Sequence, residues 1–261
     1  MSQIEILSQE VDTDNGQPSY YRMLDGGKYF RYITIDPGTL DEEDLSFPPA
    51  LLEKLPAFPA GDWNSGRIAR AENGVLYFVE TIKKGLPSID HIWHEKSFDY
   101  LSLQMKKRLG ANVHLVTAPH VHPENRDVIA KFARFPWEVE RYALETKSYE
   151  WIKGHGIGPQ FLGHLTEDGR VIGFLMEKLE GRHATIADLP ACKEVVGRLH
   201  ALGILHGDLN KHNFLITGKD ARIIDFETAK LSSDRDKMYQ EAQTLEKELL
   251  DESGRGGMSV I

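Results

Sequence analysis

The first third of the chain alternates apolar with polar residues, which is the period of β-strands. Two β-hairpins are predicted, over residues 20–35 and 67–81, because an Asp-Gly-Gly and an Asn-Gly turn interrupt these runs. The prolines within residues 36–62, around a short acidic patch, predict a connection that wraps around the domain between the hairpins. Residues 1–17 are polar and acidic and are expected to be poorly ordered.

A helical period appears after Pro136, where one apolar stripe spans residues 139–152. Further helical stripes span residues 192–202 and 238–249, and residues 97–108 also resemble a short amphipathic helix. Additional strands are predicted at residues 113–118, 127–132, 161–165, 171–176, 214–216 and 222–224. Because strands come first, then a helix, more strands, and finally helices with loops, the predicted fold class is α+β with two lobes.

Composition excludes some functions. The 261 residues carry a net charge of −9, which argues against a broad nucleic-acid-binding surface but permits a local cationic pocket. Cys192 is the only cysteine, so no intramolecular disulfide can form, and a reducing compartment is expected. The N-terminus lacks signal-peptide features, and no apolar run approaches the ~20 residues of a membrane helix. A soluble protein of the cytoplasm or nucleus is therefore expected.

The most informative residues are 206–213, which read HGDLNKHN, and 225–227, which read DFE. They place Asp208, Asn213 and Asp225 at set spacings beside short apolar runs typical of strands. An acid, an amide and a second acid are the groups needed to orient a hydroxyl and to hold Mg²⁺ on a nucleoside triphosphate. The alternative is a turn in which Asp and Asn cap backbone amides, but two matched motifs at a fitting separation argue against it.

These motifs resemble the H-x-D-x-x-x-x-N and D-F-G sequences of the protein-kinase-like superfamily. The resemblance covers about residues 110–231. It implies ATP and Mg²⁺ as cofactors, Asp208 as the catalytic base, and Asn213 and Asp225 as metal ligands.

Lys131 ends a Val-Ile-Ala-Lys run that resembles the kinase strand whose lysine contacts the α- and β-phosphates. A lone lysine at a strand end is otherwise usually solvated edge protection. The resemblance implies a glutamate on the following helix that pairs with Lys131. We choose Glu145, which lies on the inward stripe, over Glu138 in the first turn, where an acid often serves the helix dipole, and over Glu150, which lies off the stripe.

Residues 177–181, which read EKLEG, resemble the kinase hinge. By this resemblance, Met176 guards the rear of the adenine pocket, and the backbone of Glu177, Lys178 and Leu179 binds adenine. The alternative, that Met176 is ordinary core and the charged run a solvated loop, stays open.

The chain departs from protein kinases in three ways. No G-x-G-x-x-G precedes Lys131, so the residues that cover the phosphates are not identified. Gly207 stands where protein kinases have arginine, and Glu227 replaces the glycine of D-F-G; both changes resemble aminoglycoside and choline kinases. Only a short segment follows Glu227, which resembles the compact C-lobe of the small kinase of the KEOPS complex, and there is a general likeness to fungal kinase-like proteins.

The domain prediction has four parts: an N-terminal extension with the first strands of the N-lobe, the N-lobe core with the hinge, a reduced C-lobe with the catalytic and metal loops, and a disordered tail. Their ranges are residues 1–109, 110–179, 180–252 and 253–261.

The leading hypothesis is an ATP- and Mg²⁺-dependent phosphotransferase that acts on a hydroxyl of a small molecule, or of a protein docked atypically. A pseudokinase or binding scaffold is the main alternative, with a protein partner on the N-terminal extension or the tail helix. Nucleotidyl transfer or other ATP-linked chemistry on the same fold is a weaker alternative. Neither a nucleic-acid nor a membrane partner is expected.

Overall fold

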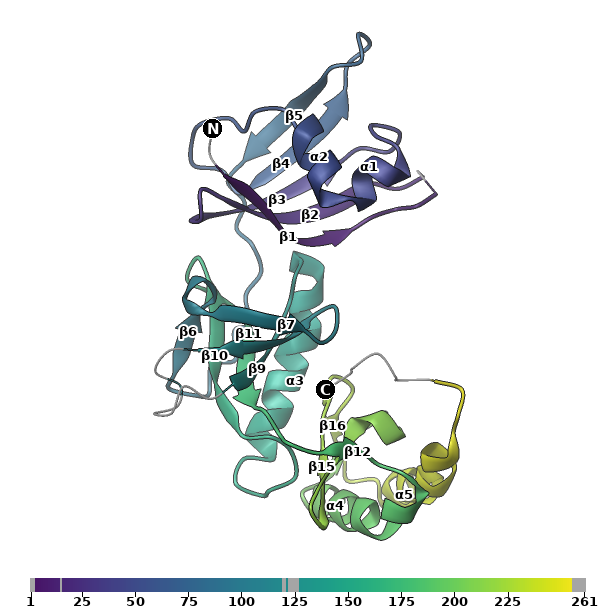
Figure 1. The fold of residues 1–261 in the computed structure, drawn as a ribbon. Helices are drawn as coiled ribbons and strands as arrows, with labels where there is room; N and C mark the ends of the chain where they lie inside the picture. Colours follow the sequence, from purple (N-terminus) through teal and green to yellow (C-terminus); the bar gives the residue numbers. More distant parts are fainter. Residues whose placement is uncertain (1–2, 15, 119–120, 122–126, 255–261) are drawn as a thin grey trace. The chain divides into compact units, whose positions relative to one another are not determined.

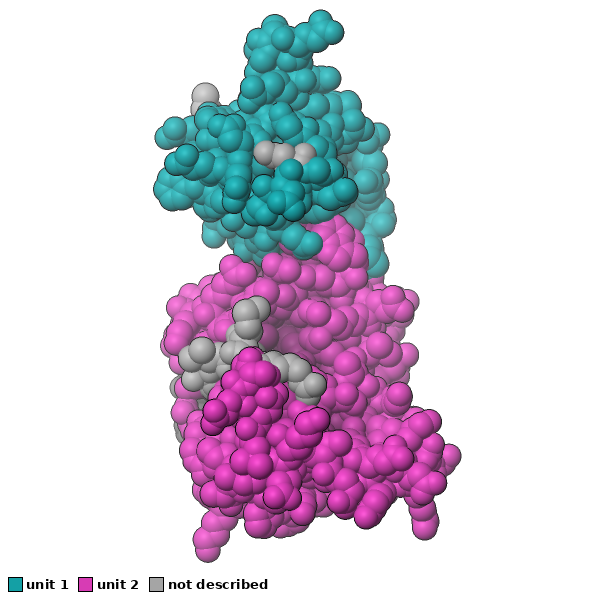
Figure 2. Space-filling model, turned by 90° about the vertical axis from the view of Figure 1, so that its right-hand side faces the viewer, with its two compact units in different colours: residues 1–87 teal, residues 88–261 magenta. Residues whose placement is uncertain are grey.

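The computed structural model describes residues 3–14, 16–118, 121 and 127–254. The chain divides into two compact units, residues 1–87 and 88–261, which are coloured separately in Figure 2. The range predicted as extension plus first N-lobe strands therefore divides after Pro87, and residues 88–109 belong to the second unit. Most of the tail predicted to be disordered, residues 255–261, lies outside the described residues.

Unit 1 is a five-stranded sheet with the order β1-β2-β3-β4-β5. Its strands are β1 (Ile4–Glu10), β2 (Ser19–Asp25), β3 (Tyr29–Ile35), β4 (Ser65–Arg70) and β5 (Leu76–Ile82). All neighbours are antiparallel except β3 and β4, which are parallel. The two predicted hairpins are confirmed as β2–β3 and β4–β5.

One prediction for unit 1 is wrong. Residues 4–10 form the edge strand β1 because Ile4 and Ile6 pack against the apolar core of this unit. The predicted wrapping connection contains two short helices, α1 (Glu42–Ser46) and α2 (Pro48–Lys54), which lie across one face of the sheet (Figure 1). Proline fits the first turn of α2, where its missing N–H has no helical partner in any case.

The first lobe of unit 2 is a six-stranded sheet with the order β6-β10-β11-β9-β8-β7, packed against one helix. Its elements are β6 (Ser97–Asp99), η1 (Tyr100–Ser102), β7 (Gln104–Arg108), β8 (Val113–Thr117), β9 (Asp127–Phe132), η2 (Pro136–Glu138), α3 (Val139–Trp151), β10 (Phe161–Glu167) and β11 (Arg170–Glu177). Strands β8 to β11 and helix α3 lie where the sequence predicts them.

The helix predicted over residues 97–108 is wrong. The segment forms β6, a single 3₁₀ turn and β7. Its apolar stripe covers no core, because Leu101 and Met105 are each 42% exposed. Strand pairing determines the structure of this segment instead, because β6 runs parallel to β10 and β7 is antiparallel to β8.

The second lobe of unit 2 contains two helices and two small sheets, with strand orders β12-β14-β15 and β13-β16. Its elements are β12 (Arg182–His183), η3 (Ile186–Asp188), α4 (Leu189–Ala201), β13 (Ile204–Leu205), η4 (Lys211–Asn213), β14 (Phe214–Thr217), β15 (Asp220–Ile223), β16 (Lys230–Leu231) and α5 (Arg235–Leu250). Helix α4 packs against α5 and β15, and one apolar core continues through both lobes. The predicted α+β, two-lobed fold is confirmed for unit 2.

Among the described residues, no helix is both long and apolar enough to cross a membrane.

His164 on β10 is an ionisable group inside this core. Its ring lies 5.1 Å from the Phe161 ring and 6.3 Å from that of Trp93, and its Nε2 accepts a hydrogen bond from the His94 backbone N–H at 3.3 Å. Burial, followed by the positive charges of His94 and His91, lowers the pKa of His164 to about 4. The folded protein therefore requires the neutral imidazole.

We predict that His164 sensitises the fold to acid. Its folded-state pKa lies below the ordinary value of about 6.5, so its stabilising contribution is complete above that pH and is lost as the pH falls toward 4. Between about pH 7 and 4.5, the free energy of unfolding should fall by on the order of 2 kcal/mol more in the wild type than in His164→Gln. Urea unfolding at both pH values measures this, with the exposed His155→Gln as the control. An equal loss in wild type and His164→Gln would contradict the prediction.

Candidate active site

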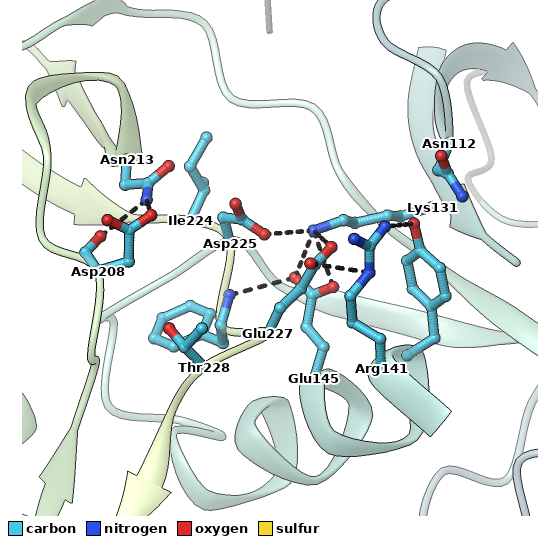
Figure 3. Close-up of polar contacts among 12 residues, drawn as sticks. Asn112, Lys131, Arg141, Glu145, Asp208, Asn213, Ile224, Asp225, Glu227 and Thr228 are labelled. Carbon is cyan, nitrogen blue, oxygen red and sulfur yellow. Dashed lines mark hydrogen bonds and ion pairs between the residues drawn. The ribbon is translucent and has the colours of Figure 1, made fainter. Parts of the chain in front are cut away.

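Asp208 lies in the loop between β13 and β14, where side-chain amides of the same loop bond to it (Figure 3). The Asn213 Nδ2 donates to the backbone oxygen of Asp208 at 2.9 Å and lies 3.4 Å from its Oδ2. The Asn210 Nδ2 donates to the same Oδ2 at 3.2 Å. The Ile224 backbone N–H donates to the Asn213 oxygen at 2.9 Å, which ties this loop to the segment that carries Asp225. Two of the predicted functional residues, Asp208 and Asn213, are therefore in direct contact.

His206 supports this loop as a neutral ring. Burial is the first cause of its lowered pKa, and it outweighs the nearby carboxylates. Its Nε2–H donates to the Ile224 oxygen at 3.2 Å, and its Nδ1 accepts from the Asp208 N–H at 3.3 Å. The two bonds fix one tautomer, because one ring nitrogen donates and the other accepts.

Lys131 lies at the centre of the cleft, with its Nζ bonded to three carboxylates (Figure 3). The Nζ is 2.8 Å from Glu145 Oε2, 2.6 Å from Asp225 Oδ1 and 3.0 Å from Glu227 Oε1. Burial alone would lower the pKa of Lys131, but these three charges raise it well above its ordinary value. The cleft therefore contains a permanently charged ammonium, contributed by β9.

The two acids that contact Lys131 most closely have pKa values shifted in opposite directions. Burial raises the pKa of Glu145 to about 7, against the opposing charge of Lys131. For Asp225, burial is outweighed by Lys131, so its pKa lies below the ordinary value. Asp225 is also 40% exposed along its side chain, so it faces the open part of the cleft as an ionised carboxylate.

The D-F-E segment has a defined conformation. Asp225 has φ = 65°, in the left-handed region that a non-glycine residue rarely adopts. Phe226 is fully buried, 5.2 Å from the His206 ring and 5.4 Å from the Tyr149 ring, and its N–H lies 3.3 Å from Glu145 Oε1. The buried ring and this hydrogen bond hold the strained residue in place.

The structure distinguishes the candidate partners of Lys131. Glu145 contacts it, as described. Glu138 instead accepts hydrogen bonds at the start of the helical segment, from the Arg134 and Phe135 backbone N–H groups at 2.6 and 3.1 Å. Glu150 contacts His91 Nε2 at 2.6 Å.

The residues predicted to bind adenine, Met176 to Leu179, all line the cleft that contains Lys131. Met176 is buried, and its sulfur accepts a hydrogen bond from the Tyr149 hydroxyl at 3.1 Å. The Glu177 N–H donates to the Gln160 oxygen at 2.8 Å, so it is not available to a ligand. Of the backbone N–H groups expected to donate to adenine, that of Glu177 is therefore excluded, and those of Lys178 and Leu179 remain.

The tip of the β7–β8 hairpin, residues 109–112, also lines this cleft, and β8 pairs with the lysine strand β9. No glycine pattern in the sequence identifies this tip. Arg141, on the cleft side of α3, was missed as well. Its spacing of four residues from Glu145 was the available signal, because residues i and i+4 share a helix face.

Glu241 on α5 holds the loop between β13 and β14 through hydrogen bonds to its backbone. Its Oε1 accepts from the Gly207 N–H at 2.7 Å, while its Oε2 lies 3.3 Å from the His206 N and 2.6 Å from His200 Nε2. Gly207 has φ = 88°, and a Cβ there would lie 3.0 Å from the Thr228 oxygen. The glycine is therefore required by the backbone. No local sequence pattern connects Glu241 to residues 34 positions away.

Comparisons with known proteins agree with this geometry. The model of the lipopolysaccharide kinase (Kdo/WaaP) family matches residues 176–253, the span from the hinge to the end of α5. A probable bifunctional tRNA threonylcarbamoyladenosine biosynthesis protein of Methanothermobacter thermautotrophicus is 33% identical over 114 residues, which is 42% of this chain and 21% of that protein. A protein of the same name from Methanoculleus marisnigri is 30% identical over 100 residues, 37% of this chain and 18% of that protein.

The chain thus spans about a fifth of the length of these curated relatives. The family model and the two relatives support a kinase-like superfamily, in agreement with the two motifs, and with it a kinase-like phosphotransferase.

We predict that Glu241→Gln destabilises the protein by about 1.5–3 kcal/mol, because a largely buried ionised acceptor that several donors share is lost. Urea unfolding measures the change. Glu246→Gln, at an exposed position of the same helix, is the matched control and should have little effect. Equal stability of the two variants would show that Glu241 does not anchor the loop.

Proposed function

We propose that the protein is an ATP- and Mg²⁺-dependent phosphotransferase that acts on a hydroxyl, with Asp208 as the general base. One observation carries this proposal: segments that lie far apart in the sequence bring Lys131, Asp225 and Asn213 to the wall of one cleft, next to Asp208. The acceptor is a small molecule, or a protein docked without the usual peptide platform.

The lining of the cleft suits a nucleotide in two respects. Apolar side chains, among them Ile129, Met176 and Leu215, fit the faces of a flat base. The Lys131 ammonium stays charged at every physiological pH and suits the phosphates.

The donor set suits Mg²⁺, which prefers carboxylate and amide oxygens. Asn213 and Asp225 both line the cleft. A backbone hydrogen bond, from the Ile224 N–H to the Asn213 main-chain oxygen, connects the two segments that carry them. Asp225 and Glu227 are both partly exposed acids beside Lys131, and their carboxylate oxygens are of the type that Mg²⁺ prefers. When bound, the metal would neutralise charge on the phosphates.

Asp208 is suited to accept the proton of an attacking hydroxyl. The carboxylate is partly exposed, and the side-chain amides of Asn210 and Asn213 orient it. Both amide groups act as hydrogen-bond donors to Asp208 Oδ2, so the carboxylate is positioned by contacts in which it is the acceptor.

We expect Asp208→Ala to lower ATP-dependent phosphorylation by at least ~10²-fold, because a general base is removed, while nucleotide binding persists. Incubation with ATP, Mg²⁺ and a panel of metabolites, with mass spectrometry of the products, provides the assay. Asp220→Ala, an exposed acid on β15, is the control. An unchanged rate in Asp208→Ala would refute the role of this residue, and an adenylylated product would indicate nucleotidyl transfer instead.

A pseudokinase or binding scaffold is the competing function, and one observation favours it. In the structure, Lys131 is fully engaged by three carboxylates, an arrangement that could serve stability alone. Thermal shift with ATP in the presence and absence of Mg²⁺ separates the two. Stabilisation that depends on Mg²⁺ together with product formation supports the enzyme, whereas no shift under either condition supports the scaffold.

A further inference from the structure

Several hydrogen-bond donors at the tip of the β7–β8 hairpin are used within the protein. The Leu109 and Gly110 N–H groups both donate to the Val113 oxygen, at 2.9 and 3.1 Å. The Asn112 Nδ2 donates to the Phe132 oxygen at 3.2 Å and to Glu138 Oε2 at 2.9 Å. A glycine-rich loop binds phosphates through free backbone N–H groups. Two of those at this tip, of Leu109 and Gly110, are already committed, so further donors to phosphates are expected elsewhere on the cleft wall.

Arg141 lies on the wall of the same cleft with unused donors. Its side chain is 51% exposed, its Nε lies 3.0 Å from Glu227 Oε2, and its Nη2 donates to the Tyr142 hydroxyl at 3.4 Å. The guanidinium carbon lies 5.5 Å from the centre of the Tyr142 ring. Guanidinium has five N–H donors, so these contacts hold its position and leave others for a ligand.

Glu227 brings the two cations of the cleft together. One of its oxygens lies 3.0 Å from Lys131 Nζ, and the other lies 3.0 Å from Arg141 Nε (Figure 3). A single carboxylate thus fixes an ammonium and a guanidinium on the same wall. A glycine at this position would leave Arg141 without that partner.

We infer that Arg141, positioned by Glu227, binds the β- and γ-phosphates of the nucleotide in place of a glycine-rich loop. The inference rests on the proposed function, because it requires a nucleotide in this cleft. The planar fork of guanidinium matches two phosphate oxygens at once, and its charge is permanent. Arg141 is thereby a phosphate-binding residue, and Glu227 is its positioning residue.

The test compares ligands that differ only in their phosphates. Binding of adenosine, ADP and ATP, each with Mg²⁺, is measured by calorimetry for the wild type, Arg141→Met and Arg141→Lys. Methionine keeps the apolar stem over Tyr142 without the charge, and lysine keeps the charge without the fork. Lys147→Met, which removes one positive charge from the same helix away from the cleft, is the matched control.

In Arg141→Met, we expect the dissociation constants of ADP and ATP to rise ~10-fold or more, as for the loss of a hydrogen bond to a charged group, with adenosine unchanged. Arg141→Lys should fall between Arg141→Met and the wild type, and Lys147→Met should bind all three ligands as the wild type does. Equal weakening of adenosine and ATP in Arg141→Met would show a structural role and overturn the inference, as would unchanged ATP binding. A wild-type protein that binds none of the three ligands would refute the proposed function itself.

Discussion

The architecture of the cleft depends on one buried ammonium, the Nζ of Lys131. A charge inside a protein is tolerated only when it is paired, because its desolvation is expensive. Here the pairing requires three parts of the chain at once: β9 supplies the lysine, α3 supplies Glu145, and the D-F-E segment supplies Asp225 and Glu227. Displacing any one of these elements would leave a charge with incomplete compensation, so the ammonium fixes the helix and the loop relative to the sheet.

The loop between β13 and β14 is held by a different kind of interaction. Its supports are directional hydrogen bonds: the neutral ring of His206 donates to the Ile224 backbone oxygen, and Glu241 accepts from the Gly207 N–H. The Asp208 carboxylate is oriented by the side-chain amides of Asn210 and Asn213. The division is physically sensible. The charged cluster can change partners when a cation or a polyphosphate binds, while the loop that carries the proposed base is fixed by bonds that such a ligand does not disturb.

The sequence predicted which polar residues of unit 2 lie close together better than it predicted some of its elements. Asp208, Asn213 and Asp225 could be proposed as a group because their spacing is local, their residue types are informative, and short apolar strands flank them. Residues 97–108 were misassigned as a helix, because periodicity cannot reveal that Leu101 and Met105 face solvent. Glu241 could not be found at all, since its importance arises only when α5 packs behind the loop and its acid reaches a backbone amide.

The absence of a G-x-G-x-x-G motif is consistent with the proposed role of Arg141 in phosphate binding. A glycine-rich loop needs glycine because backbone N–H groups must approach the phosphates closely. A guanidinium that reaches in from α3 makes no such demand, so the hairpin tip is free to use its amides internally, as Leu109 and Gly110 do. The replacement requires an anion that holds the guanidinium in place, and Glu227 is that anion. On the proposed role of Arg141, the lost glycines at the tip and the glutamate in D-F-E are therefore two parts of one change, which moves phosphate binding from the backbone of a loop to the side chain of a helix.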